Sequence, residues 1–262
     1  MLFSVLVAPH GDEIINPTTE DMKKLNYAMQ RASKSLKGAD IFIVISPHNI
    51  RIDTQIGIIL TENLRGSLKV GNKRIRRTYH CDRDLSGKIY RFAKSINLPV
   101  VGVNFGALEG PLSCMPLDWG SLIPLYFLPK KPSVLITPAR AVSREKLIKF
   151  GEVLGEVLES DSRKISLVVS ADHAHTHSRD GPYGYSTYAK CYDEIVLKSL
   201  KEGNLSPLLE ISDAMLEDAK PDSYWQLLML HGLMKKVKLQ MKFVEYAVAS
   251  YFGMAVAYFT RG

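Results

Sequence analysis

The chain of 262 residues is 46% hydrophobic, which is enough apolar material for the core of one domain near the upper limit of single-domain size. Lys and Arg outnumber Asp and Glu by 34 to 27, but the basic residues are scattered in small groups, which argues against nucleic-acid binding. The three cysteines have no C-x-x-C spacing, the apolar N-terminus lacks the basic region and cleavage site of a signal peptide, and no apolar run approaches the roughly 20 residues of a membrane helix. We therefore expect a single domain over 1–262, located in the cytoplasm, with neither nucleic acid nor membrane as a partner.

Two early strands are each followed by a Pro-His pair. The apolar run 2–8 predicts a strand that ends at Pro9-His10. A helix then starts at Pro17-Thr18-Thr19, with a Thr at its cap, and runs through about Leu36. The apolar run 41–45 predicts a second strand, which delivers Pro47-His48-Asn49 in the same relation. Because the carboxyl ends of parallel strands meet at one rim of a sheet, His10 and His48 are candidates for a shared site.

Strand and helix patterns continue to alternate along the rest of the chain. The expected strands are 55–60, 100–103, 134–137, 165–170, 243–249 and 254–259, and the expected helices are 82–96, 143–158, 188–200, 213–217 and one that opens at 222. The polar, Gly-punctuated segment 66–78 predicts a hairpin or an excursion from the sheet. The fold class that follows is α/β, with a mostly parallel central sheet flanked by helices and a C-terminal strand pair.

Three of the seven histidines follow the strand 165–170, in the segment Ser170-Ala171-Asp172-His173-Ala174-His175-Thr176-His177. Residues two apart in an extended segment face the same way, so the three imidazoles could point into one cavity. The bland alternative is a polar surface loop that happens to be rich in His.

Two imidazoles and one carboxylate on one face of a site form the arrangement that non-haem iron(II) oxygenases use, and a further imidazole could then act as the base. His10 and His48 are the ligand candidates, but the residue pattern does not select one carboxylate among 27. For Asp222 the pattern alone favours a helix N-cap, and for Trp119 a partly buried core aromatic.

Several separate motifs resemble those of the class III extradiol ring-cleavage dioxygenases, the superfamily of the protocatechuate 4,5-dioxygenase beta subunit, over nearly the whole chain. The motifs that carry the resemblance are Pro9-His10, Ile45-Ser46-Pro47-His48, Leu117-Asp118-Trp119-Gly120 followed by Ile123-Pro124-Leu125-Tyr126, Ser170-Ala171-Asp172-His173-Ala174-His175, and Asp222 ten residues before Gly232. Two of them depart from the family pattern. Asp222 stands where the family usually has Glu, and Trp119 stands where it usually has a pocket-lining His.

The resemblance implies a role for each matched residue. His10, His48 and Asp222 would hold Fe(II), with Zn as an ion that purified protein could carry instead. His175 would be the catalytic acid/base residue. Asn49, Trp119, Asp172 and His173 would line the substrate pocket.

The implied reaction is cleavage of a catecholic, ortho-dihydroxy aromatic ring by O2, with a semialdehyde product, and the resemblance favours a homo-oligomer. Two other readings stay open at this point. One is a metal-dependent hydrolase or a structural metal site. The other is a Memo-like binding module that uses the same pocket for recognition, because the branch with Ser-Ala-Asp-x-x-His includes the Memo-like proteins.

Overall fold

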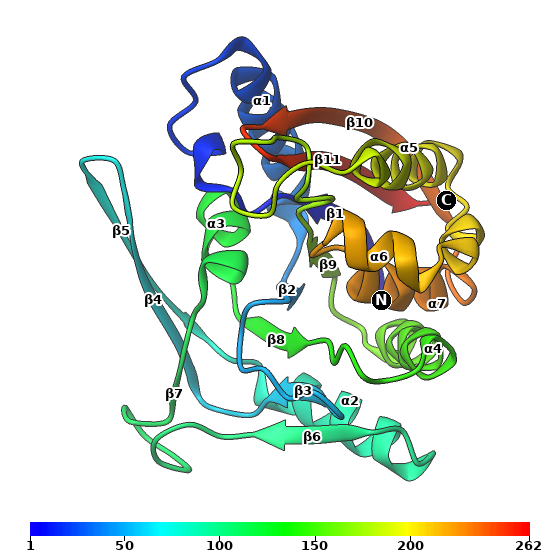
Figure 1. The fold of residues 1–262 in the computed structure, drawn as a ribbon. Coiled ribbons are helices and arrows are strands. Elements are labelled where there is room, and N and C mark those ends of the chain that lie inside the picture. Colours follow the sequence, from blue (N-terminus) through cyan, green and yellow to red (C-terminus); the bar gives the residue numbers. More distant parts are fainter.

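A computed structural model describes all 262 residues. One sheet of eight strands runs through the molecule (Figure 1). In the order in which they lie side by side, its strands are β10 (Leu239–Ala249), β11 (Phe252–Arg261), β1 (Leu2–Ala8), β9 (Ile165–Ser170), β2 (Ile41–Ile45), β8 (Ser133–Thr137), β3 (Ile56–Ile59) and β6 (Val100–Val103). The pairs β1–β9, β9–β2, β2–β8 and β3–β6 are parallel, whereas β10, β11 and the β8–β3 pair are joined in antiparallel fashion.

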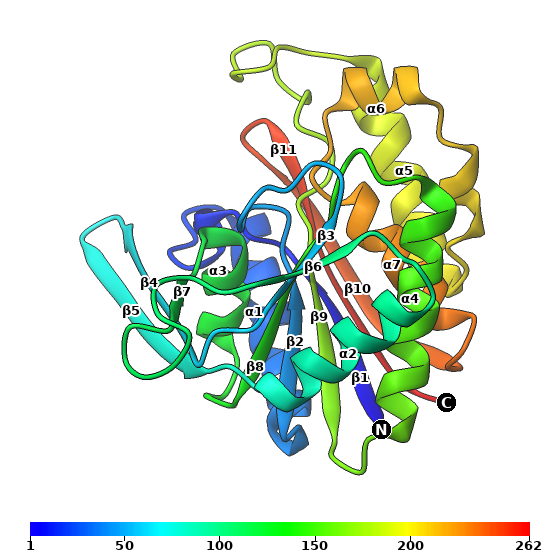
Figure 2. The same cartoon turned by 90° about the horizontal axis from the view of Figure 1, so that it is seen from below.

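Helices cover both faces of this sheet (Figure 2). They are α1 (Glu20–Ser35), α2 (Arg83–Ser95), α3 (Trp119–Phe127), α4 (Arg144–Ser160), α5 (Thr187–Glu202), α6 (Asp213–Ala219) and α7 (Tyr224–Met234), with short 3-10 turns at Asp12–Ile14, Leu36–Gly38 and Ser206–Glu210. None of the helices is both long enough and apolar enough to cross a membrane. The expected α/β domain with a mostly parallel sheet, flanking helices and a C-terminal strand pair is confirmed.

Alternate residues of the central strands enter two separate cores. Ile41, Ile43 and Ile45 pack with α2, α4, α5 and α7 on one face, and Phe42 and Val44 pack with α1 and α3 on the other. Every residue of β2 is buried, because successive side chains of a strand point to opposite faces and both faces are covered. This is why the strand reads as a continuous apolar run.

A second, three-stranded sheet projects from the body of the molecule beside α3 (Figure 1). Its order is β5 (Lys73–His80), β4 (Asn63–Val70) and β7 (Cys114–Pro116). β4 and β5 form the hairpin that the segment 66–78 predicted, with Gly71 in the left-handed conformation at its tip (φ 55°).

The residues at the N-termini of four helices differ in how they cap. Thr19 and Asp82 cap α1 and α2 by accepting bonds from the N–H groups of Met22 and Leu85. Ser143 occupies the N-cap position of α4, but its side chain makes no capping bond. The reading of Asp222 as an N-cap is wrong, because Ser223 takes that position in α7 and the carboxylate of Asp222 turns toward the histidines.

α4 and α7 approach each other backbone to backbone at two glycines. A Cβ atom on Gly151 would lie 1.9 Å from the carbonyl oxygen of Met229, and one on Gly232 would lie 1.9 Å from that of Ile148. Backbone cannot move aside as a flexible side chain can, so each position requires hydrogen in place of a methyl group. The contact fixes α7, and with it the segment that carries Asp222.

Replacing Gly151 by alanine should therefore destabilise the fold. We expect Gly151→Ala to lower the free energy of unfolding by about 1 to 3 kcal/mol or more, because the added methyl forces the two helices apart. Gly38→Ala is the control, since its Cβ would meet only the ring of Phe3 at 3.4 Å, and it should change stability by less than about 0.5 kcal/mol. Urea denaturation of both variants measures the difference, and equal midpoints would contradict the tight crossing.

Candidate metal centre

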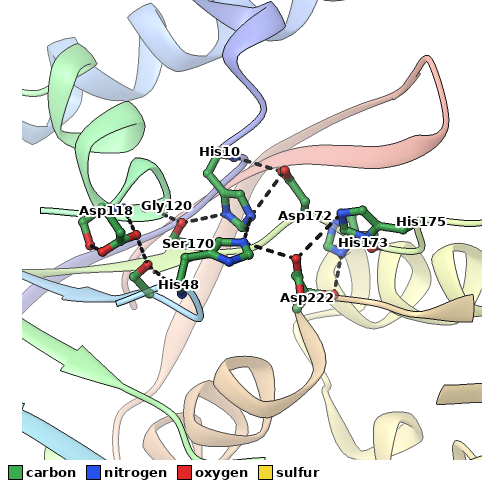
Figure 3. A network of polar contacts seen from close by, with 12 residues as sticks. His10, His48, Asp118, Gly120, Ser170, Asp172, His173, His175 and Asp222 are labelled. Carbon is green, nitrogen blue, oxygen red and sulfur yellow. Dashed lines mark hydrogen bonds and ion pairs between the residues drawn. The ribbon is translucent and has the colours of Figure 1, made fainter. Parts of the chain in front are cut away.

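Three side chains from distant parts of the chain converge at the carboxyl-end rim of the central strands (Figure 3). His10 follows β1, His48 follows β2, and Asp222 lies just before α7. One ligand atom from each lies within 4.8 Å of the others: the Nε2 atoms of His10 and His48 are 3.0 Å apart, and His48 Nε2 is 3.2 Å from Asp222 Oδ2. β9 lies between β1 and β2, so the two Pro-His strands share a rim without being neighbours.

The tautomer of His10 follows from a single hydroxyl proton. Ser170, at the end of β9, donates its hydroxyl to the carbonyl of Gly120, so its oxygen can only accept from His10 Nδ1, which lies 2.9 Å away. The proton of the neutral ring is therefore on Nδ1, and Nε2 presents a lone pair toward His48 and Asp222. This is the state in which an imidazole binds a metal ion.

Electrostatics favour the neutral form of His10 and the ionised form of Asp222. Burial lowers the pKa of the His10 imidazole well below its usual range, and the nearby His48 ring lowers it further. Burial acts to raise the pKa of Asp222, but the hydrogen bond to His48 and the neighbouring imidazoles outweigh it, and the pKa of this carboxyl is lowered. Two imidazole nitrogens and a carboxylate oxygen, with the remaining side open to cavities, are a donor set that suits a divalent transition metal.

Arg140 holds the other oxygen of Asp222. Its Nη2 lies 2.6 Å from Oδ1, and its guanidinium lies over the ring of Trp225, 4.4 Å from the centroid. Only Oδ2 thus faces the two imidazoles. Arg140 was missed in the sequence, although its place just beyond the strand β8, at the same rim, was a signal that could have indicated it.

A polar cluster around Asp118 supports His48. Ser46 donates to Asp118 Oδ1 at 2.7 Å, Asn49 donates to Asp118 Oδ2 at 3.0 Å, and the same carboxylate caps α3 through the N–H of Ser121. Asn49 therefore faces Asp118 and lines neither cavity of the site, contrary to the expectation that it contacts substrate. Its role here is to hold the loop that carries His48.

Trp119 lies flat on His48, with ring centroids 4.3 Å apart and an interplanar angle of 28°. The side chain is 49% exposed and lines both cavities, so it is a pocket wall and not the core aromatic that its surroundings in the sequence favoured. The next residue must be small, because a Cβ on Gly120 would lie 2.6 Å from Ser46 Oγ and 3.1 Å from His48 Cδ2.

His173, His175 and His177 point to three different places. In a regular strand the backbone N–H groups of residues two apart point the same way. Here the backbone N–H of His173 donates to the carbonyl of Gly253, whereas that of His175 donates to the carbonyl of Ala219 on another segment. The segment is therefore not a regular strand, and the expectation that all three rings share one cavity is wrong.

Only His175 of the three reaches the cluster. Its Nδ1–H donates to the carbonyl of His173 at 2.8 Å, which leaves a lone pair on Nε2, 3.7 Å from Asp222 Oδ2. Its ring stacks on Phe252, with centroids 5.3 Å apart. Burial lowers the pKa of His175, partly offset by Asp222, so the ring is a neutral acceptor at neutral pH.

The other two histidines have structural contacts. His173 is fully buried and bonds Ser223 through Nδ1 at 3.0 Å, and burial lowers its pKa to about 4. It lines neither cavity, so its expected place in the substrate pocket is not where the ring lies. His177 bonds Asp193 at 2.8 Å, outside the cluster.

Asp172 supports His10 and lines the smaller cavity. Its Oδ1 accepts the backbone N–H of His10 at 2.9 Å, and its Oδ2 lies 3.4 Å from His10 Nε2. Burial raises the pKa of this carboxyl well above its usual range, although the bond from His10 works in the opposite direction. Asp172 is therefore a carboxyl that can hold a proton beside the three ligand candidates.

Two cavities, of about 610 and 290 Å³, adjoin the cluster. They share five lining residues, which are His48, Trp119, His175, Tyr183 and Asp222. The larger cavity adds charged side chains and Trp225, and the smaller adds His10, Asp172, Tyr251 and Phe252. The cluster is thus reached from two sides, which leaves coordination positions open for small molecules.

Known proteins resemble this chain both in sequence and in fold. The chain is 24% identical over 214 residues to Protein CA_C1420 of Clostridium acetobutylicum, covering 80% of this chain and 46% of that protein. It therefore spans about half the length of the curated relative it matches. The crystal structure of the uncharacterized protein JW3007 from Escherichia coli K12 has the same fold, with a TM-score of 0.62 at 17% identity over 97% of this chain and 99% of that one.

A family model described as the catalytic LigB subunit of aromatic ring-opening dioxygenase matches residues 4–259, which is nearly the whole chain. This match agrees with the resemblance found in the motifs around His10, His48 and His175. The chain belongs to the LigB family of aromatic ring-opening dioxygenases.

Proposed function

We propose that the protein is a non-haem Fe(II)-dependent extradiol dioxygenase that cleaves a catecholic substrate with O2. The observation that carries this proposal is the convergence of His10, His48 and Asp222 beside two open cavities, with the neutral Nε2 of His175 3.7 Å from Asp222 Oδ2. Membership of an aromatic ring-opening dioxygenase family supports the same reaction.

In this proposal His10 Nε2, His48 Nε2 and Asp222 Oδ2 hold the iron. Iron(II) bound there would bring the diol and dioxygen together and would lower the pKa of the diol hydroxyls. Asp222, in place of the usual Glu, fits this role. Its Oδ1 is held by Arg140, and its Oδ2 faces both imidazoles. Ser170 keeps His10 in the tautomer that can bind metal.

His175 is the proposed acid/base residue. Its Nδ1–H is committed to the carbonyl of His173, so the lone pair on Nε2 is the one available to take a proton from the second hydroxyl and later return it. Burial keeps the ring neutral and ready to accept. The stacking contact with Phe252 fixes the plane of the ring.

The larger cavity is the proposed substrate site. Its volume of about 610 Å³ leaves room for a ring with a further substituent, since small-molecule sites span about 300 to 1,000 Å³. Trp119, where the family usually has His, stacks one face on His48 and has no group that can exchange a proton as an imidazole does. We also expect a reducing compartment such as the cytoplasm, in keeping with three cysteines that form no disulfide. Assembly into a homo-oligomer stays a prediction.

The first prediction concerns metal binding. Anaerobically prepared protein should bind about one Fe(II) per chain, and His48→Ala should weaken that binding at least about tenfold, because one of three ligands is lost. His80→Ala is the control, since His80 is an exposed residue of β5 outside the cluster. Anaerobic titration with elemental analysis measures both. Unchanged stoichiometry and affinity in His48→Ala would place the ion elsewhere.

The second prediction separates the base from the ligands. His175→Gln should keep iron bound and the fold intact, yet lower ring-cleavage turnover by about 10² to 10⁴, as expected for a lost general acid/base residue. His177→Gln in the same loop is the matched control, because a Gln amide can still donate to Asp193, and its turnover should stay close to wild type.

Oxygen uptake over a panel of catechols, with iron measured on the same samples, reads out both variants. Loss of iron in His175→Gln would make His175 a ligand, and unchanged turnover would remove its role as the base. No uptake with any diol by the iron-loaded wild type would contradict the dioxygenase and favour a binding module.

A further inference from the structure

The hairpin of β4 and β5 carries most of the excess positive charge of the chain. Residues 63–80 contain six Lys and Arg and no Asp or Glu, whereas the whole chain has a net charge of +7. None of the six cations forms an ion pair within 4.0 Å, although many surface cations on the helices do. The hairpin projects from the body of the molecule (Figure 1). Five of the six cations are exposed, and Arg77 is half-buried.

The register of the hairpin brings these cations together. Ser67 pairs with Arg76, Arg65 pairs with Thr78, and Lys69 lies directly opposite Arg74. Like charges that face each other across an antiparallel pair destabilise it, whereas opposite charges stabilise it. Arg65 and Arg76 are diagonal neighbours on the same face, so an anion bound between them would reduce the repulsion among these cations.

A cavity of about 560 Å³ lies among these residues. Four cationic residues line it, Arg65, Arg76 and Arg77 from the hairpin and Lys130 from the loop after α3, together with the hydroxyl residues Ser67 and Thr78. Neither hydroxyl makes a hydrogen bond within the protein, and the lining contains no apolar and no acidic side chain. Arg77 lies over the ring of Tyr126, 5.2 Å from the centroid, which holds its guanidinium in place.

We propose that this cavity, the hairpin anion site, binds a small molecule with several phosphate groups. Guanidinium groups and hydroxyls are the donors that phosphate oxygens use, and four cations can neutralise more than one phosphate. The volume is that of a small-molecule site, and the lack of aromatic side chains leaves nothing on which nucleic-acid bases could stack. The ligand is recognised through its phosphates alone.

The hairpin anion site is distinct from the metal centre. None of its lining residues lines either cavity beside His10, His48 and Asp222. Leu68, which lies between Ser67 and Lys69 in β4, instead lines the smaller cavity of the metal centre, because successive residues of a strand point to opposite faces. The hairpin thus borders both sites, with Leu68 toward the metal centre and with Arg65, Ser67 and Arg76 on the opposite face.

Calorimetric titration with sodium tripolyphosphate tests the proposal on the full chain. Wild-type protein should bind about one tripolyphosphate at least tenfold more tightly than inorganic phosphate, because several cations act on one ligand. The double variant Arg65→Ala/Arg76→Ala should weaken binding at least tenfold. Its matched control is Lys190→Ala/Lys198→Ala on α5, which removes the same charge elsewhere and should change the affinity less than twofold.

A second arm excludes binding through a metal ion. His48→Ala should bind tripolyphosphate as wild type does, and loss of binding in that variant would move the ligand to the metal centre. Equal affinity of the hairpin variant and its control would overturn the site and leave the cations as protection of the edge strand β5 against pairing with other chains. A single-stranded oligonucleotide or an anionic phospholipid vesicle that binds more tightly than tripolyphosphate at the same salt concentration would overturn the choice of a small ligand.

Discussion

Two imidazole nitrogens and a carboxylate oxygen face one another across 3.0 and 3.2 Å, and both His10 Nε2 and Asp222 Oδ2 present lone pairs to the space between them. Such an arrangement is costly in a buried site unless a proton or a cation lies among the acceptors. The surroundings of His10 and Asp222 disfavour an added proton on either side chain. Ser170 fixes the one proton of His10 on the far side of the ring, and Arg140 takes the spare oxygen of Asp222. Much of the local structure can be understood as holding the two imidazoles and the carboxylate close together.

The positions of those acceptors depend on backbone contacts far from the cluster. His10 and His48 leave strands whose neighbour β9 supplies Ser170, so the sheet register sets the distance between the two rings. Asp222 depends on a different constraint, the close crossing of α4 and α7 at Gly151 and Gly232. His175, the proposed base, lies on a loop whose backbone N–H groups bond to the start of β11 on one side and to the end of α6 on the other. A rigid frame around a site open to two cavities suits catalysis, because the catalytic groups need no rearrangement to meet a substrate.

Local patterns in the sequence were enough to predict the fold and two of the three ligand candidates. Buried strands read as apolar runs, and the Pro-His pairs follow them directly, so His10 and His48 could be found by spacing alone. Asp222 could not, since its contact with His48 joins segments 174 positions apart and its local pattern is that of a helix cap; the family resemblance was needed to select it. The expectation that His173, His175 and His177 share one cavity failed because their backbone N–H groups bond to two different segments and the strand period is not kept. Arg140 and the role of Asn49 depend on tertiary contacts that no local pattern encodes.

If the three ligand candidates hold a metal ion, their wide separation along the chain would tie the lifetime of the protein to the supply of that metal. No continuous fragment shorter than 10–222 contains all three, so an ion held by them would bind the native state and have almost no affinity for the unfolded chain. Such an ion acts as a reversible cross-link, and at a free concentration a hundred times the dissociation constant it stabilises the native state by about 2.7 kcal/mol. Metal starvation would then lower the abundance of the protein as well as its activity, because proteases degrade the fraction of molecules that is unfolded.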